Sequence, residues 1–249
     1  YGPSDDAIGA GIFSGRYTAA IVAGGFAAKK VLRRCGIRVF SYIREMAGVR
    51  CPEMDSAAAL SATDAYKRMR CDYDPFYQQI YINGRITKEM RLLEKMAVLA
   101  RVEREIDHIR SLAPEFNHAV IREQYGIHPV VNCPDIGEAE EMLKAANRIS
   151  GQGDSSGGVV EVVVRGAPAG LGEPVFSKLD AELGRMLGIG AVKGVEIGAG
   201  FRVKDMTGFE DNDQMRSVNG RVVFDTNNAG GITGGLSTGQ DIVVRLAVK

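Results

Sequence analysis

The chain lacks an excess of charge of either sign and lacks any long apolar run. Lysine and arginine together number 31, as do aspartate and glutamate. A balanced charge gives no reason to expect nucleic acid or an anionic membrane as a partner. No apolar run approaches the ~20 residues that span a bilayer, and no signal-peptide pattern opens the chain. These absences predict a cytoplasmic protein without a membrane or nucleic-acid partner.

Metal-binding and disulfide patterns are absent as well. The cysteines are Cys35, Cys51, Cys71 and Cys133, and the histidines are His108, His118 and His128. The cysteines lie far apart and form no Cys-x-x-Cys pair, and the histidines form no His-Glu-x-x-His motif. No metal site is therefore expected, and the cysteines are expected to be reduced and mostly buried.

The most distinctive stretch that is present is a glycine-rich loop, Phe224–Gly239. It contains two Gly-Gly pairs among asparagine, serine and threonine residues. Glycine lets a backbone approach a ligand or another strand closely, and successive N–H groups can turn toward one anionic or planar group. Apolar runs at 221–224 and 242–248 flank it, which predicts a loop between two strands. It holds neither a Walker nor a Rossmann motif, and a tight turn without a ligand is the alternative.

Length and periodicity predict the fold class. At 249 residues with 45% hydrophobic composition, the chain is long enough for a full core and compatible with one domain. The expected strands are 37–43, 159–165, 201–204 and 221–224, and the expected helices are 16–34, 88–112, 138–149 and one that begins at a capping box over 177–180. Strands joined by short turns, with small-residue helices between them, predict an α+β fold with antiparallel sheets.

The helix expected at 16–34 is built mainly from small residues, so neighbouring elements can approach most of its sides. This composition predicts a helix that lies in a central buried layer. Arg33 and Arg34 favour its C-terminal end, and Gly36 is expected to end it in a left-handed conformation.

Three further blocks share their order and spacing with one known family. They are Gly9–Ala19, Gly157–Pro174 and Ala191–Gly198, and the glycine-rich loop follows them. In this order they resemble the chorismate synthase family. The resemblance covers about 1–44 and 133–249, and the stretch at about 47–132 is interpreted as an insertion without recognisable chemistry. The chain is thus interpreted as a single partial domain, 1–249, with an extra helical insertion.

The resemblance implies a sandwich of antiparallel sheets around a helical layer, and a homotetramer. It implies chorismate synthase activity, the 1,4-trans elimination of phosphate and a proton from 5-enolpyruvylshikimate 3-phosphate to give chorismate, in the shikimate pathway of aromatic amino acid biosynthesis. Reduced FMN is the implied cofactor, and the protein has to hold two anionic ligands, exclude water and supply proton transfer. A non-catalytic remnant that keeps the scaffold and the oligomer surface is the alternative.

The resemblance also implies site residues, position by position. Arg16 matches a substrate-binding arginine, with solubility at a helix start as the alternative role. The implied cofactor-binding positions are Ile12, Phe13, Ser14, Gly190, Ala191, Gly234 and Lys249. The family has an arginine where Ile12 stands, and the loss of this cation weakens the expected hold on the flavin phosphate. Further motif positions, for which a structural role is equally compatible, are Lys193, Asn227 and Asn228.

The family's proton-transferring histidines do not occur in these blocks. They belong to Ser-His-Gly and Pro-Gly-His-Ala-Asp contexts that fall before Tyr1, and a late Gly-Arg-His-Asp-Pro block falls after Lys249. None of the three histidines of the chain stands in such a context. No catalytic residue is therefore assigned, and the chain is expected to be the middle of a longer protein and inactive alone.

Overall fold

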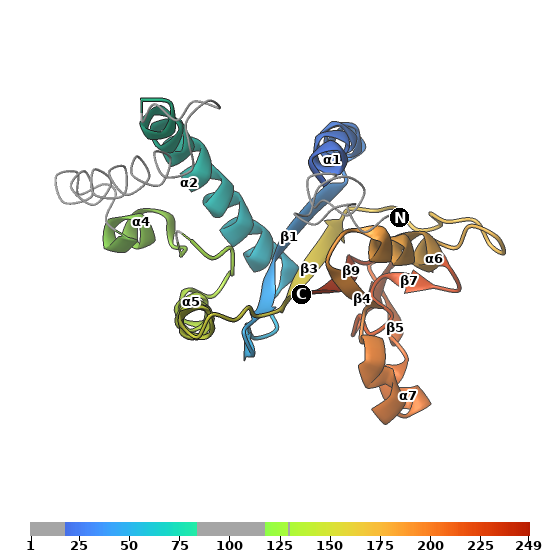
Figure 1. Ribbon diagram of the computed structural model, residues 1–249. Helices are drawn as coiled ribbons and strands as arrows, with labels where there is room; N and C mark the ends of the chain where they lie inside the picture. The colour runs from blue at the N-terminus through green and yellow to red at the C-terminus, as the bar shows by residue number, and fades with distance from the viewer. Residues whose placement is uncertain (1–17, 84–117, 129) are drawn as a thin grey trace, which may run out of the picture. The chain divides into compact units, whose positions relative to one another are not determined.

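The computed structural model describes residues 18–83, 118–128 and 130–249 (Figure 1). The chain divides into two compact units. The first unit joins Tyr1–Gly48 to Arg148–Lys249, and the second is Val49–Asn147. Each unit is described below by itself.

An antiparallel sheet forms the centre of the first unit. Its strands are β1 (Arg38–Met46), β3 (Gly158–Arg165), β9 (Ile242–Val248) and β4 (Val192–Ile197), which lie side by side in that order (Figure 1). The two-residue β2 (Val49–Arg50) continues the sheet beyond β1. The pairs β1–β3, β3–β9 and β4–β9 are all antiparallel. The strands predicted at 37–43 and 159–165 are confirmed, as is the antiparallel α+β class.

One face of this sheet carries the apolar core of the unit. Side chains alternate between the two faces of a strand, so Ile242, Val244 and Leu246 of β9 lie on the same face. All three are buried, and they form one cluster with Val192 of β4. The short helices α6 (Leu179–Gly184) and η4 (Arg185–Gly188) cover this face with the side chains of Leu179, Leu183 and Met186.

Helix α1 (Thr18–Arg34) ends as its sequence predicts. The Gly36 N–H donates to the Arg33 carbonyl (3.1 Å) and the Ile37 N–H to the Leu32 carbonyl (2.9 Å), and Gly36 has a φ of 78°. This left-handed glycine closes the last turn and satisfies carbonyls that the helix leaves unpaired. The predicted burial of the helix is not found here, because no residue of α1 is buried and its large apolar side chains are exposed, namely Ile21, Val22, Phe26 and Val31.

Two local predictions are wrong. The helix after Ser177 has no capping box, because the Ser177 backbone exchanges two hydrogen bonds with Glu173 and the helix begins only after Lys178. The segment 201–204 is not a strand but part of the 3-10 helix η5 (Gly200–Asp205). Its alternating apolar side chains face outward, with Phe201 76% exposed. Left-handed glycines at 198 and 200 turn the chain there, which ends the extended conformation.

Two small hairpins and one more helix follow β4. The strand predicted at 221–224 is confirmed as β6 (Arg221–Phe224), which pairs with β5 (Met215–Val218). The strands β7 (Ile232–Thr233) and β8 (Leu236–Ser237) form a second hairpin inside the glycine-rich loop. The predicted position of that loop between two strands, β6 and β9, is confirmed. The helix α7 (Gly208–Asp211) begins at a true capping box, in which Thr207 and Glu210 bond each other's backbone.

After the two-residue strand β2, with which it begins, the second unit is helical in its described part. Its helices are α2 (Ser56–Asn83), α4 (His118–Tyr125) and α5 (Ile136–Gly151), and α5 confirms the helix predicted at 138–149. Ala65 and Met69 of α2 are buried against Ile127, which follows α4. The helix predicted at 88–112 lies outside the described residues. The interpretation of 47–132 as an insertion stays a prediction.

Candidate functional site

The side chain of Asn227 closes the base of the glycine-rich loop. Its Nδ2 donates to the carbonyl of Asp241 (2.8 Å), and its Oδ1 accepts from the N–H of Gly231 (2.7 Å). Both ends of the amide are therefore used in hydrogen bonds to the backbone, one to Gly231 in the loop and one to Asp241 just after it. Of the two roles open for Asn227, the contacts show the structural one.

A carboxylate from outside the loop holds the next two residues. Asp213 Oδ1 accepts from the Asn228 N–H (2.6 Å) and from the Thr226 hydroxyl (2.6 Å), and Oδ2 accepts from the Ala229 N–H (3.0 Å). In return, Asn228 Nδ2 donates to the carbonyl of Glu210 (2.9 Å). Sequence reasoning missed Asp213, since one acid among several between 205 and 213 carries no distinguishing signal.

Replacing Asp213 by alanine is expected to lower the unfolding free energy by about 1–3 kcal/mol, because three donors lose their shared acceptor. At roughly 2–4 °C per kcal/mol, the thermal midpoint falls measurably. Asp213→Asn keeps one acceptor oxygen and should recover part of the loss. Asp205→Ala is the control, because Asp205 is exposed and its ion pair is with the neighbouring Lys204. An equal loss in both alanine variants contradicts the prediction.

Ser237 joins the loop to the upstream block Gly157–Pro174. Its hydroxyl donates to the Pro168 carbonyl (2.6 Å) and accepts from the Leu171 N–H (2.8 Å), while its own N–H donates to the Leu171 carbonyl (2.9 Å). The Gly170 N–H donates to the Ser237 carbonyl (2.8 Å). The two blocks of the resemblance thus form one hydrogen-bonded framework.

The glycines of the loop and Gly198, which packs against it, divide into two kinds. A Cβ on Gly198 would meet the backbone of Asn228 and Gly230, and a Cβ on Gly231 would lie 2.6 Å from the Asp241 carbonyl oxygen. These glycines allow backbone segments to pack against each other. Gly234 differs, because in the described part of the chain no atom beyond its two adjacent residues lies within 4 Å of the position that its Cβ would take. Its φ of 63° places it at the open turn between β7 and β8.

At the other end of β9 the structure brings Ala191 and Lys249 together. The Lys249 N–H donates to the Ala191 carbonyl (3.1 Å), and Gly190 is the next residue along the chain. Lys249 Nζ donates to the carbonyl of Ser155 (2.7 Å) and is exposed. An ammonium group has three donors, so this bond leaves Nζ able to bind an anion.

Gly234 is not close to this cluster. Its neighbour Gly231 lies beside Asp241 at the start of β9, whereas Lys249 follows the end of the same strand. A seven-residue strand spans about 23 Å at its usual rise. The remaining predicted site residues lie outside the described residues, namely Ile12, Phe13, Ser14 and Arg16.

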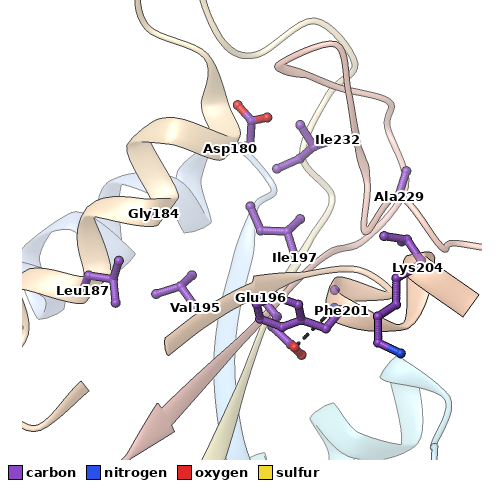
Figure 2. Close-up of a pocket in the computed structure, with 12 residues that line it drawn as sticks. Asp180, Gly184, Leu187, Val195, Glu196, Ile197, Phe201, Lys204, Ala229 and Ile232 are labelled. Carbon is purple, nitrogen blue, oxygen red and sulfur yellow. Dashed lines mark hydrogen bonds between the residues drawn. The ribbon is translucent and has the colours of Figure 1, made fainter. Parts of the chain in front are cut away.

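A hollow of about 590 Å³ lies along β4, beside the glycine-rich loop (Figure 2). Gly184 and Leu187 from α6 and η4 form one wall, and Phe201 of η5 lies opposite. Ala229 and Ile232 supply the side toward the loop. Two carboxylates and one ammonium group lie among the apolar lining, from Asp180, Glu196 and Lys204. Sequence reasoning missed this hollow because its lining comes from segments that are separate in sequence.

A row of polar side chains crosses the sheet on the face opposite the apolar core. Tyr42, Glu161 and Arg245 are register partners on β1, β3 and β9. The Tyr42 hydroxyl donates to Glu161 Oε1, Arg245 Nε donates to Glu161 Oε2 (2.7 Å), and Arg44 Nε lies 3.8 Å from the same oxygen. Arg245 Nη1 also donates to the carbonyl of Gly198 (2.6 Å). The row therefore connects the sheet to the glycine packing beneath the loop.

Fold and site define an α+β protein in which glycine-rich loops are fixed at the ends of an antiparallel sheet. The chain is similar to a solved structure titled as a crystal structure of chorismate synthase. The match covers 95% of this chain and 56% of that chain, with a TM-score of 0.64 and 24% sequence identity. A likeness at this identity shows the shared fold.

Sequence comparisons give the family. The chorismate synthase family model matches residues 1–249. Chorismate synthase of Acetivibrio thermocellus is 38% identical over 252 residues, covering 100% of this chain and 48% of the relative. That of Archaeoglobus fulgidus is 40% identical over 242 residues, covering 97% and 50%. The chain belongs to the chorismate synthase family, and it spans about half the length of these curated relatives.

Among the residues that the structure describes, no helix is long and apolar enough to cross a membrane. Within the same residues, no group of three or more histidine, cysteine, aspartate or glutamate side chains could hold a metal ion.

Proposed function

We propose that this chain supplies flavin- and phosphate-binding framework to a chorismate synthase. The activity is that of a carbon–oxygen lyase, which eliminates phosphate from 5-enolpyruvylshikimate 3-phosphate to give chorismate. Membership of the family over the whole chain supports this, as does the identity of 38% and 40% to two chorismate synthases. The observation that carries the proposal is the open backbone at Gly234, in a loop that Asn227, Asn228 and Ser237 fix to the surrounding chain through their side-chain hydrogen bonds.

The residues present fit reduced FMN as the cofactor. The space beside Gly234 admits a planar group close to the backbone, which a side chain at that position would prevent. The exposed ammonium of Lys249, held beside Ala191, suits a phosphate as a point charge. When bound, the flavin supplies an electron to the elimination and takes it back, so the protein's own task is to bind, orient and exclude water.

The roles of the chain's residues in this proposal are binding roles. Arg16 holds an anionic group of the substrate with its guanidinium, whose planar fork matches phosphate and carboxylate. Gly190, Ala191 and Lys249 are proposed cofactor-binding positions at one end of the sheet, and Gly234 is a proposed cofactor-binding position at the other end. Ile12, Phe13 and Ser14 complete the cofactor contacts. No catalytic residue is assigned in this chain, and its homotetrameric assembly in the cytoplasm belongs to the same proposal.

The proposal predicts that Gly234→Val abolishes flavin binding by the protein. The valine side chain would occupy the space that the flavin needs. Because Gly234 has positive φ, valine there also strains the backbone by about 1–3 kcal/mol. Titration of FMN, followed by fluorescence quenching, measures the binding, and a thermal melt of the same variant measures the strain.

Gly220→Val is the matched control. Gly220 has a φ of 74° and, like Gly234, has no atom within 4 Å of the position of its Cβ. It lies in the turn between β5 and β6, so valine there adds the same strain without touching the proposed site. We expect the thermal midpoints of Gly234→Val and Gly220→Val to fall by a similar amount. Only Gly234→Val is expected to lose FMN binding. Unchanged FMN affinity in Gly234→Val would refute the role of this glycine.

A further inference from the structure

The turn between β7 and β8 carries two backbone donors without an acceptor. Gly234 and Gly235 form this turn, with φ of 63° and 88°. In the described part of the chain, neither the Gly234 N–H nor the Gly235 N–H donates a hydrogen bond. Gly235 is buried, and buried backbone donors are nearly always paired. The two successive N–H groups are therefore available to an acceptor from a ligand, as in anion-binding turns.

The side chain of Lys178 lies on the same turn. A Cβ on Gly235 would lie 2.6 Å from Lys178 Cγ and 3.0 Å from Lys178 Cδ. The ammonium nitrogen is only two bonds beyond Cδ, so it stays close to the turn. The next residue fixes this approach, because the Leu179 N–H donates to the Gly235 carbonyl (2.8 Å). Helix α6, which begins at Leu179, is in contact with the hairpin of β7 and β8 (Figure 1).

The charge of Lys178 is not neutralised by the residues that the structure describes, since its ammonium forms no ion pair or hydrogen bond with them. The carboxylates of α6 have other partners. Asp180 accepts from the Ala181 N–H (2.8 Å), and Glu182 pairs with Arg185 (3.3 Å). An ammonium group and two free N–H groups all donate and none accepts, which is the donor set that suits a phosphate.

We propose that Lys178 and the backbone N–H groups of Gly234 and Gly235 form a binding site for a phosphate monoester. This inference rests on the proposed function, in which both ligands, FMN and 5-enolpyruvylshikimate 3-phosphate, carry such a group. Lys249 follows the far end of β9, so one exposed lysine at each end of the framework can bind one phosphate.

Lys178→Met tests the charge and keeps an unbranched stem on Gly235. The substitution should weaken the binding of inorganic phosphate by about tenfold or more, the usual effect of losing a hydrogen bond to a charged group. Lys178→Arg keeps the charge and should retain most of the affinity. Isothermal titration calorimetry of the protein with inorganic phosphate measures each dissociation constant. Lys144→Met is the matched control, because Lys144 is exposed, pairs with Glu141 and belongs to the second unit.

The two ligands identify the source of the phosphate. If the site takes the cofactor, Lys178→Met should weaken FMN binding by about tenfold and leave the binding of riboflavin, which lacks the phosphate, unchanged. If the site takes the substrate, FMN binding should stay unchanged and the dissociation constant of 5-enolpyruvylshikimate 3-phosphate should rise about tenfold. The thermal midpoint of Lys178→Met should stay within a few degrees of that of the unsubstituted protein, because Lys178 is exposed.

Unchanged affinity of Lys178→Met for inorganic phosphate, FMN and the substrate would overturn the inference. An equal loss in Lys144→Met would also overturn it, and so would a parallel loss of riboflavin and FMN binding, since the phosphate would then not be the group recognised. The proposed function fails in a different way. A protein that binds inorganic phosphate through Lys178 but binds neither FMN nor the substrate would keep the site and lack the function.

Discussion

Gly198→Ala is expected to destabilise the first unit by about 2–6 kcal/mol. Gly198 has a φ of 59°, and a residue with a Cβ is strained there by about 1–3 kcal/mol. The added methyl group would also meet the backbone of Asn228 and Gly230, neither of which can rotate away, and such overpacking costs a further 1–3 kcal/mol or so. At roughly 2–4 °C per kcal/mol, the thermal midpoint should fall by about 4–24 °C.

Gly194→Ala, within β4 and four residues before Gly198, is the matched control. A Cβ on Gly194 would lie 3.6 Å from the Ala247 Cβ, which is an ordinary contact, and Gly194 does not have positive φ. The thermal midpoint of Gly194→Ala should therefore stay within a few degrees of that of the unsubstituted protein. If Gly198→Ala melts at the same temperature as Gly194→Ala, the close packing of Gly198 on Gly230 is not a constraint on the fold.

Glu161→Ala is expected to cost about 3–5 kcal/mol, the usual effect of removing one partner from a buried ion pair. Glu161 is 7% exposed, and its carboxylate accepts from Tyr42 and Arg245 while Arg44 lies beside it. Without the carboxylate, two guanidinium groups face each other across the sheet. Urea unfolding measures the loss of free energy.

Two comparisons separate the effect of losing the buried charge of Glu161 from the effect of losing its packing. Asp225→Ala removes the partner of Arg216 in an exposed pair with the same 2.7 Å separation as the Glu161–Arg245 pair, and should change stability by less than about 1 kcal/mol. The double variant Glu161→Leu/Arg245→Leu removes both charges and should recover part of the loss, giving a coupling energy in a double-mutant cycle. A loss in Glu161→Ala as small as that in Asp225→Ala contradicts the buried role of this carboxylate.

Much of the sheet could be predicted because its signals are local. The apolar run of β3 and the alternation in β1 follow directly from strand periodicity, and Gly36 ends α1 through its own backbone freedom. The wrong prediction of a strand at 201–204 has a local cause too. Phe201 and Val203 alternate as they would in a strand, but two left-handed glycines, at 198 and 200, turn the chain there.

The site could be predicted only in part. The glycine-rich loop was recognisable from composition, and the placement of Lys249 beside Ala191 follows from pairing of β4 with β9. The hollow could not be predicted, because its lining comes from segments that are separate in sequence. Asp213 acts on the loop from 15 residues upstream of Asn228, and no periodic pattern marks such a contact.

The row of Tyr42, Glu161 and Arg245 has a consequence for the order of folding. Tyr42 and Glu161 are 119 positions apart, and Glu161 and Arg245 are 84 apart. Each pairing must therefore close a long loop before it yields any stabilisation, and chains dominated by such contacts fold slowly. Until the sheet closes, the apolar strands β3 and β9 have no partner and are open to pairing with other chains. Refolding from denaturant should therefore give its best yield at low protein concentration.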